Sequence, residues 1–73
     1  MIKEISAKVH EAALRSNKIA MFHLQVLMHA HELASTDPIE FCRMIKVPES
    51  YATEYRKMIS LAKLMREERI TLT

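Results

Sequence analysis

The chain has 73 residues, which is enough for one domain with a thin core and too few for an enclosed active-site cavity. Its 49% hydrophobic and 27% charged residues argue against a disordered chain. The net charge of +2 is modest, and the middle of the chain is acidic between two mildly basic ends. The sequence therefore lacks the strong cluster of basic residues that is typical of a nucleic-acid-binding surface.

Glycine is absent and there is a single cysteine. Without glycine, hairpin-rich β folds are disfavoured and a glycine-rich nucleotide loop is excluded. A single cysteine cannot form an internal disulfide. The longest stretch without Lys, Arg, Asp or Glu is Ile19–His31, which is too short to span a bilayer. We therefore expect a cytoplasmic protein with no membrane partner.

A first helix is predicted over Ile2–Arg15, because apolar residues recur along it at helical spacing. Its apolar stripe consists of Ile2, Ile5, Val9 and Ala12 or Ala13. We expect this helix to pack on the core and complete a small bundle. The alternative is that its polar edge docks on a partner, through Lys3, Lys8, Glu11 and Arg15.

A second helix is predicted over Lys18–Leu33, after a break at Ser16-Asn17, whose side chains can cap the free N–H groups of the next helix. Its apolar surface is broad, which is typical of a central helix that is contacted from several sides. The residues on this surface are Ile19, Met21, Phe22, Leu24, Val26, Leu27, Met28, Ala30 and Leu33.

A third, short helix is predicted over Pro38–Ile45. Asp37 can cap it, Pro38 occupies the first helical position, and Glu40 follows three residues after the cap, as in a variant capping box. Pro48 disfavours helical geometry at the residue before it and so limits the length of this helix. A fourth helix is predicted from Glu49 to Glu68.

The segment Pro38–Lys57 resembles the helix-turn-helix of bacterial and phage transcription regulators. The resemblance is carried by the inward-facing residues Phe41, Cys42, Ile45, Val47, Ala52 and Tyr55. One departure is Lys46, which stands at a corner where glycine is common in this family. A non-glycine residue in a left-handed conformation costs about 1–2 kcal/mol.

The predicted fold is therefore all-α, a small bundle of three to four helices that contains a helix-turn-helix-like unit. We expect one domain, with an N-terminal segment (residues 1–17), a helix-turn-helix-like core (18–68) and a frayed tail (69–73).

The resemblance implies that the helix after the turn enters the major groove of DNA. The groove-facing positions would be Pro48, Glu49, Ser50, Thr53, Glu54 and Lys57. Two acids against one base oppose binding to phosphates, although nearby residues offer further contacts. These nearby residues are Arg43, Lys46, Tyr51 and Arg56.

This acidic face favours a protein partner. In size and type the chain also resembles the small RNA polymerase-binding regulators of lytic phages, which implies inhibition of initiation, antitermination and a place in the host cytoplasm. RNA polymerase is thus the first hypothesis for the partner. A DNA-binding repressor or activator is the alternative, and a helical assembly module that dimerises through a methionine-rich surface is the second alternative. Met44 is the best methionine candidate for a contact.

No arrangement in the sequence points to catalysis, a cofactor, a metal or a small-molecule substrate. His29 and His31 are two residues apart and point to opposite sides of a helix, so they cannot chelate one metal. Cys42 has no histidine and orienting group arranged around it and is expected to be a packing residue. The four histidines leave a pH-dependent interaction as a further hypothesis.

Overall fold

A computed structural model describes residues 1–71. Within this range the chain is helical, without strands, as the sequence predicts. Its elements are α1 (Ile2–Ala13), α2 (Lys18–Met28), α3 (Ala30–Leu33), α4 (Pro38–Met44), a 3-10 helix η1 (Glu49–Tyr51) and α5 (Ala52–Glu67). None of these helices has the length and apolar character needed to cross a membrane. Of the tail that was expected to fray, Leu72 and Thr73 lie outside the described residues.

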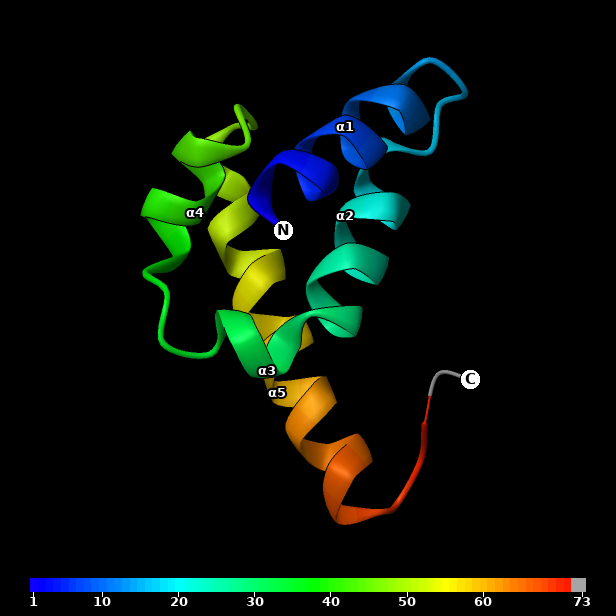
Figure 1. Cartoon of the computed structure of the whole chain (residues 1–73), viewed down its shortest axis with the longest axis vertical. Coiled ribbons are helices and arrows are strands. Elements are labelled where there is room, and N and C mark those ends of the chain that lie inside the picture. The colour runs from blue at the N-terminus through cyan, green and yellow to red at the C-terminus, as the bar shows by residue number, and fades with distance from the viewer. Residues whose placement is uncertain (72–73) are drawn as a thin grey trace.

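The helices enclose one core to which every α-helix contributes (Figure 1). α2 packs against both α1 and α5, and α4 packs against α5, so α2 is the central helix that its broad apolar surface indicated. The lower end of α5 extends beyond the other helices (Figure 1). The largest fully buried side chains are Phe22, Phe41, Ile5, Leu33, Ile45, Val9 and Val26.

The inward positions of the predicted helix-turn-helix are confirmed by burial. Phe41, Cys42 and Ile45 are fully buried, and Val47, Ala52 and Tyr55 are at most 7% exposed. The aromatic rings of Phe41 and Tyr55 lie 5.0 Å apart, so they join α4 to α5 directly. The short helix and the longer one therefore cross over a shared apolar contact, with Val47 filling the corner between them.

Asp37 caps α4 as predicted. Its carboxylate accepts a hydrogen bond of 2.9 Å from the backbone N–H of Glu40, and Pro38 occupies the first turn. Such a cap typically contributes about 1 kcal/mol. The beginning of α4 is therefore fixed by local sequence.

The sequence prediction was wrong at two other helix ends. Asn17 precedes α2, but its side chain makes no capping hydrogen bond. The predicted second helix is divided at His29 into α2 and α3, although no glycine or proline marks this position. Tertiary contacts accompany this division, because α3 packs on α5 and the Tyr55 hydroxyl donates to the carbonyl oxygens of Leu33 and Thr36.

Three helices end in the same way, with a left-handed residue where glycine is usual. The residues are Ser16, Lys46 and Arg69, with φ of 58°, 61° and 58°. At each of these helix ends, the backbone N–H of the residue after the left-handed one donates to a carbonyl of the last helical turn. Val47, for example, donates to the carbonyl of Cys42 at 3.0 Å. This is the Schellman pattern, in which a Cβ atom at the left-handed position is strained.

Helix α1 holds the corner after α4. The carbonyl oxygen of Ile45 accepts hydrogen bonds from His10 Nε2 at 2.8 Å and from Ser6 Oγ at 3.3 Å. Ile45 is the residue immediately before left-handed Lys46, so α1 fixes the direction in which the chain leaves α4. This contact joins positions more than 30 residues apart and has no counterpart in local sequence.

We predict that Lys46→Gly stabilises the protein by about 1 kcal/mol, because glycine removes the Cβ strain at φ 61°. Urea denaturation of the wild type and the variant measures the change in the free energy of unfolding. Lys46→Ala is the control, since it shortens the side chain but keeps the Cβ atom. A glycine variant no more stable than the alanine variant would contradict this explanation.

Candidate nucleic-acid and partner interface

The beginning of the second helix of the helix-turn-helix forms an exposed surface, which we call the recognition surface. It combines seven of the exposed residues of α4, the corner, η1 and the first two turns of α5; Glu40, Met44 and Pro48 are also exposed on these elements and are not included. Because Phe41, Val47 and Tyr55 are buried on the inner side of these elements, the opposite side faces solvent. The recognition surface consists of Arg43, Lys46, Glu49, Ser50, Thr53, Arg56 and Lys57.

The acidic residue at the start of the recognition surface is paired across the turn. The guanidinium of Arg43 donates to the Glu49 carboxylate at 3.0 Å. This hydrogen bond is the main reason why the pKa of Arg43 is raised above its ordinary value. The pair is solvent-exposed and contributes little stability, but it neutralises Glu49 where a phosphate would approach.

Glu54 belongs to a second pairing and is turned toward α2. Its carboxylate accepts a hydrogen bond from His23 Nε2 at 2.7 Å and another from Lys57 Nζ at 3.1 Å. The bond from His23, followed by the bond from Lys57, holds the pKa of Glu54 below its ordinary value. Only 28% of the Glu54 side chain is exposed, so it contributes to helix packing more than to the outward face.

These two pairings change the electrostatic interpretation of the recognition surface. The sequence counted Glu49 and Glu54 as free negative charges, whereas each is within ion-pair distance of a base. Among the described residues, Lys46 and Arg56 form no ion pair. The outward face thus offers two free cations, with the hydroxyls of Ser50 and Thr53 between them along the chain. Repulsion between these two acids and DNA phosphates is therefore a weaker objection to DNA binding than the sequence indicated.

Tyr51 is engaged within the fold. Its ring packs edge-on against Phe22 at 5.1 Å between ring centroids, and Lys18 Nζ lies 5.6 Å from its centroid. The ring is half-buried and holds η1 to α2. This contact with Lys18 is a cation–π interaction that was not foreseen, because the two residues are distant in sequence.

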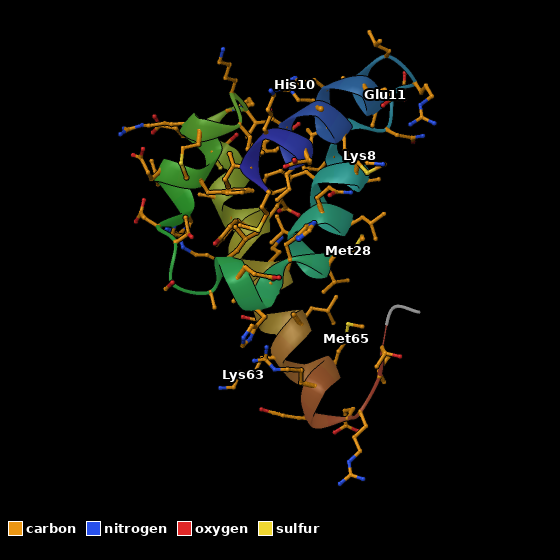
Figure 2. All side chains as sticks on the ribbon, viewed as in Figure 1. Lys8, His10, Glu11, Met28, Lys63 and Met65 are labelled. Carbon is orange, nitrogen blue, oxygen red and sulfur yellow. The ribbon has the colours of Figure 1, made fainter. Side chains whose placement is uncertain are left out.

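The four charged residues proposed on the first helix do not form one site. Lys3 lines a shallow groove between α1 and the end of α4, together with the exposed Met44. The same groove is lined by Ile2, Ser6, Ala7 and His10. Lys8, Glu11 and Arg15 are exposed but do not line it, and Figure 2 shows His10 nearer to α4 than Lys8 or Glu11.

The contacts of the histidines and the cysteine indicate structural roles and no catalytic or metal-binding role. His10 is hydrogen-bonded to Ile45, the residue after α4, and His23 to Glu54 on α5, while His31 lines a different groove. In the part of the chain that the structure describes, no three His, Cys, Asp or Glu side chains gather as a metal site. Burial raises the pKa of the Cys42 thiol, which favours the unreactive protonated form.

Only one of the ion pairs of Glu49 and Glu54 could be predicted from the sequence. Glu54 and Lys57 are three residues apart on one helix, which is a spacing that predicts an ion pair. His23 lies 31 residues from Glu54, and Arg43 reaches Glu49 across a turn, so neither partner could be identified without the tertiary structure.

We predict that Glu54→Gln destabilises the protein most at pH values above 4.5, the ordinary pKa of the carboxyl. Because the folded-state pKa is lowered, the stabilisation is present above the unfolded-state pKa and is lost as the pH falls through the folded-state pKa. Urea denaturation at a series of pH values measures the difference between wild type and variant. Glu68→Gln, at an exposed acid without an ion pair in the described residues, is the control.

The difference in unfolding free energy for Glu54→Gln should shrink on acidification, and that for Glu68→Gln should stay near zero. A Glu54→Gln effect that is independent of pH would show that the hydrogen bonds from His23 and Lys57 do not favour the ionised carboxylate.

Comparison with known protein families gives one match. A family model described as an HTH-like domain matches residues 1–68, which includes all five α-helices. Neither the curated proteins nor the solved structures contain one that matches the chain.

Proposed function

Because the chain belongs to the HTH-like domain family, we propose that it is a non-catalytic transcription regulator that binds duplex DNA through its recognition surface. One observation carries this proposal. Glu49 and Glu54, the two acids at the predicted groove-facing positions, are held in ion pairs, while Lys46 and Arg56 form none within the described residues and lie near exposed Ser50 and Thr53 in the chain.

The two kinds of side chain suit the two kinds of DNA contact. Lysine and arginine at the corner and along α5 neutralise phosphates, which supplies most of the affinity. Ser50 and Thr53 project from the first turns after the corner, and short hydroxyl side chains can donate to or accept from base edges. In helix-turn-helix proteins, the first residues of the second helix are those that contact bases.

The small number of free cations limits the affinity of a single chain. With a net charge of +2 and two unpaired bases on the recognition surface, we expect few phosphate contacts. Each such contact contributes a slope of about −0.9 to the dependence of log affinity on log salt. The proposed regulator is therefore a weak binder as one chain, with a shallow salt dependence.

A second candidate function is binding to bacterial RNA polymerase, with inhibition of initiation and antitermination. The observation that favours it is the groove between α1 and α4, where Met44 is 41% exposed beside Lys3. An exposed methionine adapts to varied apolar surfaces, and a neighbouring charge orients a protein partner. This groove and the DNA-contacting positions of α5 comprise different residues, so substitutions can separate the two functions.

We predict that Arg56→Ala weakens binding to duplex DNA and reduces the salt slope by about 1. Lys63→Ala is the control, because it removes another exposed base, nearer the other end of the same helix. Fluorescence anisotropy with labelled duplexes at two salt concentrations measures both quantities.

An equal loss of DNA affinity in the two variants would indicate non-specific attraction to the whole chain and would contradict the proposed binding surface. Absence of duplex binding by the wild type, combined with capture of polymerase that Met44→Glu abolishes, would support the second candidate instead.

A further inference from the structure

We infer that the DNA-contacting surface continues from α5 onto α2, where Lys18 binds a phosphate of the DNA backbone. The contact, which rests on the proposed function, lies outside the recognition surface and outside the helix-turn-helix. Lys18 is the first residue of α2, the central helix of the fold. The aromatic ring of Tyr51 gains a role as well, because it positions the Lys18 side chain.

The ring of Tyr51 is fixed beside the start of α5. It packs edge-on against Phe22 at 5.1 Å between ring centroids, and Phe22 is fully buried. Tyr51 is the last residue of η1 and stands between Ser50 and Thr53 in the chain. A side chain that contacts the Tyr51 ring is therefore held at the edge of the recognition surface.

Lys18 makes this contact from another helix. Its Nζ lies 5.6 Å from the centroid of the Tyr51 ring, which is within the range of a cation–π interaction. A lysine side chain loses much rotamer freedom when it is ordered. Because Lys18 is half-buried and lies over the ring, part of this freedom is already lost in the free protein, so less is lost when the side chain binds a phosphate.

A second contact shows that the first half of α2 runs beside the start of α5. His23 follows Lys18 by five residues on α2, and its Nε2 is hydrogen-bonded to the Glu54 carboxylate at 2.7 Å. Glu54 in turn follows Tyr51 by three residues, so the two contacts run in the same direction along both segments. A duplex that lies across the start of α5 therefore passes close to the beginning of α2.

The charge of Lys18 is not compensated by an acid. Over residues 1–71 Lys18 forms no ion pair, whereas Arg43 and Lys57 each contact a carboxylate. A neutral aromatic ring orients a cation without cancelling its charge. Lys18 therefore adds one more available cation to Lys46 and Arg56, and it does so from a different helix.

A backbone phosphate is the DNA group that suits Lys18. The ammonium is a compact point charge with three rotatable donors, so it binds phosphate oxygens without the fixed geometry that base recognition needs. Base edges are reached by the first residues of the second helix of a helix-turn-helix, and Lys18 lies on another helix. Phosphate contacts from neighbouring elements fix the orientation of a protein on the duplex.

Fluorescence anisotropy with a labelled duplex tests the contact in the full chain, between about 50 mM and about 200 mM salt. Lys18→Ala should weaken binding and reduce the salt slope by about 1. One phosphate contact changes the affinity about 3.5-fold over this range, so the loss in the variant should be about 3.5 times larger at the lower salt. The control is Lys8→Ala, at an exposed base of α1 without an ion pair in the described residues, and it should keep the salt slope of the wild type.

Substitutions of Tyr51 test how Lys18 is positioned. Tyr51→Leu removes the aromatic face and should weaken duplex binding less than Lys18→Ala does, whereas Tyr51→Phe keeps the ring and should bind like the wild type. In a chain that already carries Lys18→Ala, Tyr51→Leu should have no further effect on affinity, because the cation that the ring positions is gone. Circular dichroism checks that each variant keeps its helices, and if Tyr51→Leu loses them, the comparison of Lys18→Ala with Lys8→Ala decides.

NMR of the chain without DNA tests the contact between Lys18 and the ring by itself. The ring current of Tyr51 should shift the proton signals next to the Lys18 ammonium upfield. This shift should disappear in Tyr51→Leu and persist in Tyr51→Phe. Absence of the shift in the wild type would overturn the positioning role of Tyr51, whatever the result with DNA.

The outcomes separate this contact from the proposed function. Equal affinities and salt slopes for Lys18→Ala and Lys8→Ala, together with weakened binding by Arg56→Ala, would overturn the contact while the proposed function stands. If the wild type binds no duplex at all, the proposed function fails and the phosphate contact of Lys18 fails with it.

Discussion

The left-handed turn at Lys46 is the constraint on which the rest of this structure depends. A chain without glycine must still reverse direction after α4, and it does so at a residue with φ 61°. Burial of Val47 and hydrogen bonds from Ser6 and His10 to the carbonyl of Ile45 hold the turn in place. Helix α1 lies outside the helix-turn-helix, yet it determines how α5 leaves the corner. The direction in which the recognition surface faces therefore depends on contacts between the first helix and the middle of the chain.

The second feature is that two acids of this helix-turn-helix, at the corner and at the beginning of α5, are paired within the chain. Glu49 is bound by Arg43, and Glu54 is bound by His23 and Lys57. The Arg43–Glu49 pair is exposed and contributes little to stability, so its main effect is on the electrostatic field that an approaching polyanion meets. Pairing Glu54 to α2 turns its carboxylate away from the outward face. Lys46 and Arg56 are the bases of the recognition surface that form no ion pair among the described residues, and this small number agrees with the weak DNA binding that we propose for one chain.

Features carried by local sequence were predictable, and features carried by contacts between distant segments were not. The Asp37 cap and the inward residues of the helix-turn-helix follow from spacing and from side-chain chemistry; the hydrogen bond from Glu40 confirms the first, and burial confirms the second. On the broad apolar surface predicted for the second helix, Ile19, Leu24 and Met28 are exposed, so that prediction was wrong for these three residues. The division of the second helix at His29 has no local marker, because the packing of α3 on α5 accompanies it. The sequence predicts which residues follow the corner, but it does not predict how their charges are paired. A count of acids and bases ignores a histidine that reaches Glu54 from another helix.

DNA contact is tested most directly by NMR, using backbone amide shifts of the labelled chain during titration with duplex DNA. We expect saturable shifts concentrated at Ser50, Thr53 and Arg56, with smaller changes at the corner and none centred on α1. Shifts confined to the groove that contains Lys3 and Met44, or no saturable change at any residue, would contradict the assignment of α5 as the DNA-contacting helix.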